Sequence, residues 1–121
     1  MKKYSQDHEW VEVKDGVATV GISTYAADEL GDVTFVELPD VGQTIAVGDS
    51  VGVVESVKAA SDIYSPVSGT IKEVNGKLEE APEVLNTDAE GAGWICQLED
   101  INEADLESLM SEEEYEEFTG K

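Results

Sequence analysis

The sequence contains few of the residues that catalytic and metal-binding sites most often require. It has one histidine, His8, and one cysteine, Cys96, so it can form neither an internal disulfide framework nor a multi-cysteine zinc site. A Ser-His-Asp or Cys-His arrangement would have to use His8, and Cys96 lies in a segment that predicts a buried strand. We therefore expect a protein that is not an enzyme.

Basic residues are also scarce. The chain has seven lysines, no arginine and 28 acidic residues, which gives a net charge of −21. A surface this acidic cannot neutralise phosphates, so we expect no nucleic-acid partner and no anionic membrane partner. No apolar run reaches membrane-spanning length, and no secretory signal is evident, so we expect a cytoplasmic protein. The acidity suits steering towards basic surfaces on partner proteins.

Short segments rich in β-branched residues dominate the rest of the chain. They predict strands at residues 10–14, 17–22, 33–38, 44–45, 50–57, 62–66, 70–74 and 93–98. Glycine-containing turns separate them, which favours a closed sandwich or barrel of antiparallel strands. The prediction is a mainly β fold that forms a single domain over residues 1–121.

Two regions predict helices. Ser23 or Thr24 is a suitable N-cap for a short helix near residues 24–30, and Gly31 is a suitable stop. An acidic helical segment is predicted at residues 102–119, with helices near 103–118.

Within that C-terminal segment, Asn102 would cap residues 103–110, where Leu106, Leu109 and Met110 have helical spacing. A capping box at residues 111–114 would begin a second helix that continues to Phe118. We expect the apolar stripe to dock on the sandwich and the acidic residues to face solvent.

Lys58 stands alone as a base between Lys14 and Lys72. Predicted strands flank it, and the four residues 58–61 have the length of a hairpin loop. An amine held at the tip of a stiff ribbon suits a lysine that another enzyme modifies. The alternative is an ordinary solubilising charge.

Four separated motifs surround this loop in a characteristic order. They are His-Glu-Trp-Val at residues 8–11, Val-Gly-Ile-Ser at 20–23, the segment 30–39, and Gly-Trp-Ile at 93–95. The loop itself lies in Glu-Ser-Val-Lys-Ala at 55–59, which is followed by Ser-Pro-Val-Ser-Gly at 65–69. With them the chain resembles the H proteins of the glycine cleavage system. The resemblance implies a barrel-sandwich hybrid with a lipoyl hairpin over residues 50–72 and lipoate attached to Lys58.

The resemblance also implies roles for three acidic residues. Glu55, three positions before Lys58, would help a lipoate ligase or a lipoyl or octanoyl transferase to recognise the loop. Glu9 would face a groove and, with Asp62, accept charge-assisted hydrogen bonds from the protonated methylamine. The alternatives are exposed carboxylates without a role, and the sequence leaves these open.

The partners implied by the resemblance act in succession on the lipoyl arm. They are glycine decarboxylase (P protein), a folate-dependent aminomethyltransferase (T protein) and dihydrolipoyl dehydrogenase (L protein), with the carrier itself a monomer. Some segments depart from the family pattern: residues 23–27, Glu29, and residues 86–93, which lack a Pro-Tyr pair before Gly-Trp.

Several other functions stay open at this point. A biotin carrier usually has methionines beside its lysine, whereas Lys58 has Val57 and Ala59. A lipoyl domain of a 2-oxoacid dehydrogenase lacks the motifs at residues 8–11 and 93–95. An H-like lipoyl-relay or sulfur-metabolism carrier would share all these motifs, and an acidic adaptor would need no modification.

Overall fold

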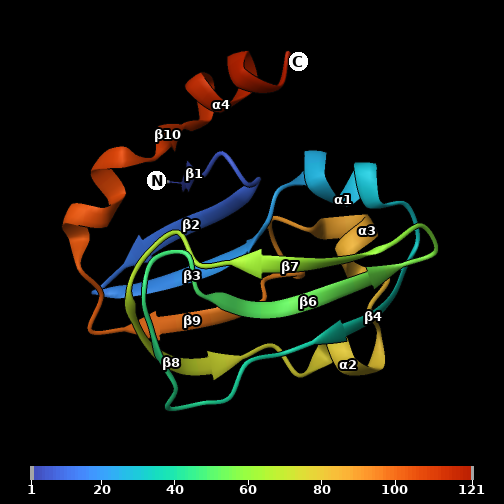
Figure 1. Ribbon diagram of the computed structural model, residues 1–121, viewed down its shortest axis with the longest axis horizontal. Helices are drawn as coiled ribbons and strands as arrows, with labels where there is room; N and C mark the ends of the chain where they lie inside the picture. The colour runs from blue at the N-terminus through green and yellow to red at the C-terminus, as the bar shows by residue number, and fades with distance from the viewer. Residues whose placement is uncertain (1, 121) are drawn as a thin grey trace.

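Two antiparallel sheets form the framework of residues 2–120, the part of the chain that the computed structural model describes (Figure 1). The larger sheet has the order β10-β1-β2-β3-β9-β8-β5. Its strands in chain order are β1 Lys2–Tyr4, β2 Glu9–Lys14, β3 Val17–Ile22, β5 Thr44–Ile45, β8 Gly69–Val74, β9 Cys96–Glu99 and β10 Met110–Ser111. The smaller sheet, ordered β4-β6-β7, comprises β4 Val33–Glu37, β6 Ser50–Ser56 and β7 Ala60–Tyr64. The predicted mainly β fold and its barrel-sandwich arrangement are confirmed, with two antiparallel sheets that share one core and do not close into a single barrel.

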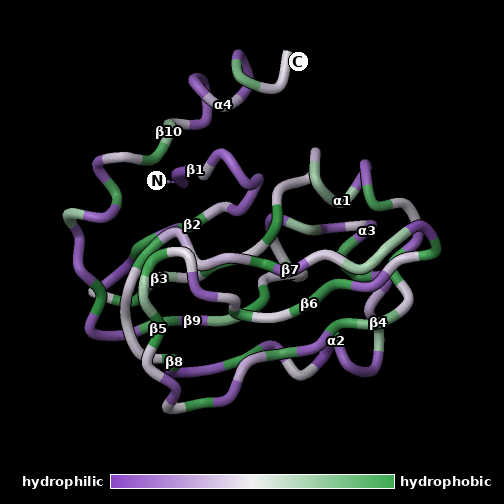
Figure 2. The backbone as a smooth tube through the Cα atoms, viewed as in Figure 1, coloured by the Kyte–Doolittle hydropathy of each residue, from purple (hydrophilic) through white to green (hydrophobic). Residues whose placement is uncertain are grey.

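Both sheets contribute to one apolar core. Val11 and Val20 come from the larger sheet, and Val36, Val54 and Ile63 come from the smaller one. All five are almost fully buried. Hydrophobic segments follow the strands in Figure 2, while helix α4 (Glu112–Thr119) is largely hydrophilic. Burial of these side chains is the main force that holds the sheets together.

The predicted β2–β3 hairpin and the helix after it are confirmed. The hairpin register pairs Glu9 with Ile22, and α1 follows directly at Thr24–Leu30. The Ser23 side chain accepts a hydrogen bond from the Ala26 N–H, so Ser23 is the N-cap and Thr24 is the first helical residue.

Two short helices, α2 (Lys77–Glu80) and α3 (Val84–Asp88), were not predicted. Neither has a side-chain cap, so the local sequence carries no start signal. Each instead buries one leucine, Leu78 or Leu85, completely in the core. Tertiary packing rather than helix propensity therefore stabilises them.

The helix predicted at residues 103–110 is wrong in part. Asn102 does cap a helical segment, but that segment is a 3₁₀ helix, η1, at Glu103–Ser108. Met110 lies instead in β10, opposite Tyr4 of β1. Neither β1 nor β10 was predicted, because each is only two or three residues long and forms by pairing with a distant segment. The capping box at Ser111 and Glu114 is confirmed at the start of α4.

The last predicted strand begins later than expected. Gly93 donates its N–H to the Asp88 carbonyl (2.8 Å), and Trp94 donates to the Gly91 carbonyl (3.3 Å), so both belong to the turn after α3. The strand β9 starts at Cys96, which is fully buried as predicted. In the part of the chain described, no helix has the length and apolarity needed to cross a bilayer.

Candidate functional site

The β6–β7 hairpin holds Lys58 at its tip. Strand β6 ends at Ser56 and β7 begins at Ala60, so the loop has three residues, 57–59, one fewer than predicted. The Ser56 hydroxyl accepts hydrogen bonds from the N–H groups of Lys58 (3.2 Å) and Ala59 (3.3 Å). Ser56 N–H also donates to the Ala59 carbonyl (2.8 Å). Ser56 is not among the residues predicted for the site, although a serine two residues before a loop position is a known turn signal.

A second contact fixes the tip against the body of the protein. Val57 donates its N–H to the carbonyl of Asp32, just before β4 (3.1 Å). The loop is therefore exposed yet held by backbone hydrogen bonds on both sides, which limits the conformations that an incoming enzyme must select.

The Lys58 side chain lies against the end of helix α1. Its Nζ is 3.4 Å from the carbonyl oxygen of Glu29, and its Cε would lie 3.4 Å from a Cβ added to Gly31. Gly31 ends the helix at a φ of +75°, a conformation that favours glycine. The absence of a side chain there leaves space for Lys58 to run along the helix end.

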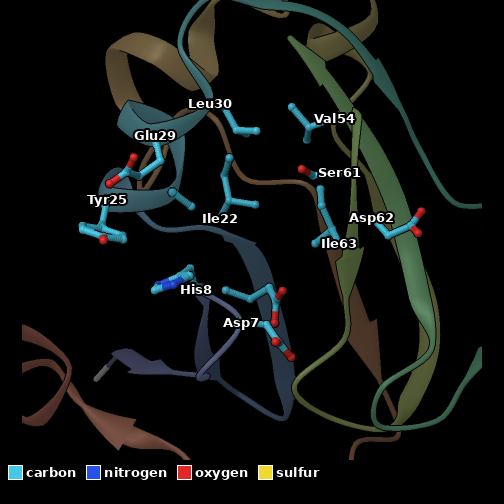
Figure 3. Close-up of a pocket in the computed structure, with 12 residues that line it drawn as sticks. Asp7, His8, Ile22, Tyr25, Glu29, Leu30, Val54, Ser61, Asp62 and Ile63 are labelled. Atoms are coloured by element: carbon cyan, nitrogen blue, oxygen red, sulfur yellow. The ribbon is translucent and has the colours of Figure 1, made fainter. Parts of the chain in front are cut away.

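A cavity of about 390 Å³ opens beside this helix end (Figure 3). One wall is formed by the turn at residues 7–9, a second by α1, and a third by β6 and β7. The apolar part of the lining includes Ile22, Leu30, Val54 and Ile63. The volume lies within the usual range for small-molecule pockets.

Glu9 is the buried charge in this cavity. Its side chain is 3% exposed, and its carboxylate accepts hydrogen bonds from Ser5 Oγ (2.6 Å) and the Tyr64 N–H (3.4 Å). Burial raises the pKa of Glu9 from 4.5 to about 7, and the hydrogen bond from Ser5 offsets only part of that effect. Near neutral pH the carboxyl group is therefore poised between its charged and neutral forms.

Asp62 and Glu55 share the outer face of the smaller sheet. In the sheet register Asp62 is opposite Val53, and Glu55 is opposite Ala60 and Phe35. Residue 62 borders the cavity, but Figure 3 shows its carboxylate turned away from Ser61 and Ile63, which face inward. The structure thus brings Glu9 into the cavity and places Asp62 and Glu55 together on the exposed sheet face.

Side chains from a segment that departs from the family pattern hold helix α1, which forms one wall of the cavity. Asn86 of α3 donates from Nδ2 to the Gly31 carbonyl (2.7 Å) and accepts from the Val33 N–H (2.9 Å). Glu90 accepts from the Thr24 N–H (2.8 Å) at the start of α1. Both ends of α1 are therefore held by side chains from residues 86–90, which the sequence analysis did not assign.

Trp10 and Trp94, the two tryptophans of the sequence motifs, pack against other parts of the protein. Trp10 is buried, and its Nε1 donates to the Ala89 carbonyl (3.1 Å). Trp94 packs against the aromatic cluster that Trp10 forms with Tyr4 and Tyr115. Within residues 2–120, no group of three or more histidine, cysteine, aspartate and glutamate side chains is arranged to hold a metal ion.

Comparisons with known proteins agree across nearly the whole chain. The family model of the glycine cleavage H-protein matches residues 2–121. The glycine cleavage system H protein of Thermotoga maritima is 52% identical over 118 residues, covering 98% of this chain and 95% of its own length. That of Alcanivorax borkumensis is 54% identical over 114 residues, covering 94% and 89%.

A solved structure shows the same fold. The crystal structure of a glycine cleavage system H protein from Mycobacterium marinum superposes with a TM-score of 0.90 at 38% sequence identity, over 99% of this chain and 97% of that one. Sequence and fold together set aside the biotin carrier, the 2-oxoacid dehydrogenase domain and the unmodified adaptor. The chain belongs to the glycine cleavage H-protein family, whose members are non-catalytic carrier subunits.

Proposed function

We propose that Lys58 carries lipoate in an amide bond at Nζ, and that the cavity beside α1 shelters the end of this arm. The chain acts as the carrier of the glycine cleavage system and moves the methylamine group of glycine between enzymes. The observation that supports the site is an exposed amine on a rigid hairpin tip, next to a cavity with one buried carboxylate.

The residues around Lys58 fit such an arm. Amide formation removes the positive charge of Nζ, and the long contact with the Glu29 carbonyl (3.4 Å) is weak enough to be given up easily. Lipoate supplies a disulfide that accepts the methylamine group and two electrons. The protein supplies the rigid anchor, the path past Gly31 and the apolar cavity walls.

Glu9 is the residue proposed to bind the amine at the end of the loaded arm. A protonated amine next to a buried carboxyl favours the ionised carboxylate, so the pair forms a charge-assisted hydrogen bond. The cavity excludes bulk water from the cargo, which would otherwise be lost to hydrolysis. Asp62 is assigned to the outer face with Glu55, where both carboxylates are available to an enzyme that acts on Lys58.

The partners follow from this function. Glycine decarboxylase loads the arm, the aminomethyltransferase unloads it, and dihydrolipoyl dehydrogenase reoxidises it, while a lipoate ligase or a lipoyl or octanoyl transferase attaches it. A net charge of −21 steers the carrier towards basic surfaces on these enzymes. The one free thiol, Cys96, is compatible with a reducing compartment, so we assign the chain to the cytoplasm.

Intact-mass analysis of protein incubated with lipoate, ATP and a lipoate ligase tests the attachment site. We expect one lipoyl adduct per chain on the wild-type protein and none on Lys58→Arg. Lys72→Arg is the matched control, because Lys72 is also exposed but lies in strand β8 and not in the hairpin loop. An adduct retained by Lys58→Arg, or none on the wild type, would refute the proposed site.

A further inference from the structure

Tyr115 of helix α4 is buried although most of its helix faces solvent. Its ring is 6% exposed and stacks on Tyr4 of β1, with the ring centroids 4.4 Å apart. Its hydroxyl group lies 2.7 Å from His8 Nδ1 and 2.7 Å from Ser23 Oγ. One phenolic oxygen thus joins three segments that are far apart in the sequence.

The two hydrogen-bond partners belong to different walls of the cavity. His8 lies in the turn at residues 7–9, which contributes one wall. Ser23 is the N-cap of α1, which contributes Tyr25, Ala26 and Leu30 to the next wall. His8 packs across the junction on Tyr25, with centroids 4.9 Å apart. Tyr115 therefore connects the walls from outside the cavity.

The backbone at His8 requires such support. Its φ is +69°, a left-handed conformation that is unfavourable for residues other than glycine. The conformation is held by hydrogen bonds from the His8 N–H to the Ser5 carbonyl (3.1 Å) and from the Ser23 N–H to the His8 carbonyl (2.8 Å). The Tyr115 hydroxyl adds the contact that orients the imidazole ring.

We infer that Tyr115 is a positioning residue for the cargo cavity. It acts through His8 and Ser23 to keep the turn at residues 7–9 against α1, and so keeps Glu9 in place. The inference rests on the proposed storage of the loaded arm in this cavity. It gives the C-terminal helix, which contributes no residue to the cavity lining given above, a part in retaining the cargo.

The donors and acceptors around the Tyr115 hydroxyl indicate the direction of its two hydrogen bonds. A phenolic hydroxyl has one proton to donate and can accept from other donors. Ser23 Oγ already accepts from the Ala26 N–H (3.1 Å), and its own proton is available to Tyr115. Tyr115 can then donate to His8 Nδ1, which would keep the imidazole in the tautomer with its proton on Nε2.

Tyr115→Phe tests the inference, because the ring stack on Tyr4 is kept and only the hydroxyl group is lost. The first readout is the nitrogen NMR spectrum of the imidazole, which is unambiguous because the chain has a single histidine. We expect one dominant tautomer in the wild type and a mixture in Tyr115→Phe. This measurement needs neither lipoate nor a partner enzyme.

The second readout is the loss of ammonia from lipoylated protein loaded with glycine by glycine decarboxylase. In that loss, the oxygen of one water molecule bonds to the cargo carbon while the bonds of this carbon to sulfur and to nitrogen break, leaving the thiol, formaldehyde and ammonium. We expect Tyr115→Phe to release ammonia about three- to tenfold faster than the wild type, as the loss of one hydrogen bond predicts. Lipoylation of Lys58 should be unchanged.

Two variants control the experiment. Ser111→Ala removes the cap of α4 but keeps the Tyr115 hydroxyl, so we expect wild-type tautomer and release rate. His8→Asn keeps a residue that tolerates a positive φ, and it should accelerate release by itself. Adding Tyr115→Phe to His8→Asn should then have no further effect, because the two act through one path.

The outcomes separate this inference from the proposed function. If the wild type retains its cargo and Tyr115→Phe retains it equally well, or if the two changes add fully, the inference is refuted. If the wild type takes no lipoate on Lys58, or releases ammonia as fast as the unfolded chain, the proposed function itself is refuted.

Discussion

At the scale of single residues, Lys58 and Glu9 both carry an ionisable group, but one side chain is exposed and the other is buried. Lys58 is exposed, as predicted from its loop, whereas Glu9 is 3% exposed and is therefore not the exposed carboxylate that was the alternative for it. Alternation fails at Glu9, Trp10 and Val11 because all three are buried. The strand is covered by the core on one face and by the Tyr4–Tyr115 aromatic cluster on the other. Only the tertiary structure could show this.

The raised pKa of Glu9 predicts a pH-dependent loss of stability. Between about pH 4.5 and pH 7 the unfolded chain releases the proton while the folded chain retains it, so the free energy of unfolding falls as pH rises. The stabilisation is fully present below pH 4.5. We expect the wild type to lose up to about 3 kcal/mol relative to Glu9→Gln across this range.

Urea denaturation at several pH values measures this difference. Glu12→Gln is the control, because Glu12 lies exposed on the same strand and should leave the pH profile close to that of the wild type. Parallel profiles for the wild type and Glu9→Gln would contradict the assignment.

At the scale of elements, the helices and hairpins that local interactions stabilise were the ones that the sequence predicted. The β2–β3 hairpin, the capped helix α1 and the capping box of α4 each carry their own start or turn residues, and all three are present. The elements that were missed, β1, β10, α2 and α3, form through distant pairing or a single buried leucine. The lysine loop was found from its flanking strands, and Ser56 carries a local turn signal that could have been recognised. Asn86 and Tyr115, in contrast, act over distant contacts that no sequence pattern reveals.

The bulge at Gly52 gives a prediction for the lysine hairpin. Gly52 has a φ of +148°, and a Cβ there would lie 2.5 Å from the Glu37 carbonyl oxygen of the neighbouring strand β4. Since backbone must move to accommodate it, we expect Gly52→Ala to reduce the free energy of unfolding by about 2–4 kcal/mol.

Gly76→Ala is a matched control in the same denaturation experiment. Gly76 has an ordinary φ of −59° and open space where its Cβ would lie, so its replacement should change stability by no more than about 0.5 kcal/mol. Equal effects of the two substitutions would show that the close approach at Gly52 is not a constraint.

At the scale of the whole molecule, one shared core joins both sheets, and the cavity forms where the lysine hairpin, α1 and the N-terminal turn meet. Family motifs in the sequence pointed to a carrier, and the comparisons confirm that. The composition of the cavity could not be predicted, because its three walls come from segments up to 56 residues apart, from Asp7 to Ile63.

Cys96 reports on the integrity of that core. It is fully buried, and burial raises the pKa of its thiol to about 12, so the reactive thiolate is absent from the folded protein near neutral pH. We expect iodoacetamide to modify Cys96 only as fast as the protein opens. The rate should rise steeply with urea, and rapid modification in native buffer, independent of urea, would contradict a closed core.

We propose that one amine on a preformed hairpin, that of Lys58, anchors the carrier arm. The most direct measurement is glycine-dependent reduction of NAD⁺ in a system reconstituted from the decarboxylase, the aminomethyltransferase, the dehydrogenase and lipoylated carrier. Lys58→Arg should keep its unfolding free energy within about 0.5 kcal/mol of the wild type, because the site is exposed. We predict turnover with the wild type and none with Lys58→Arg, and turnover that persists in this variant would contradict the account.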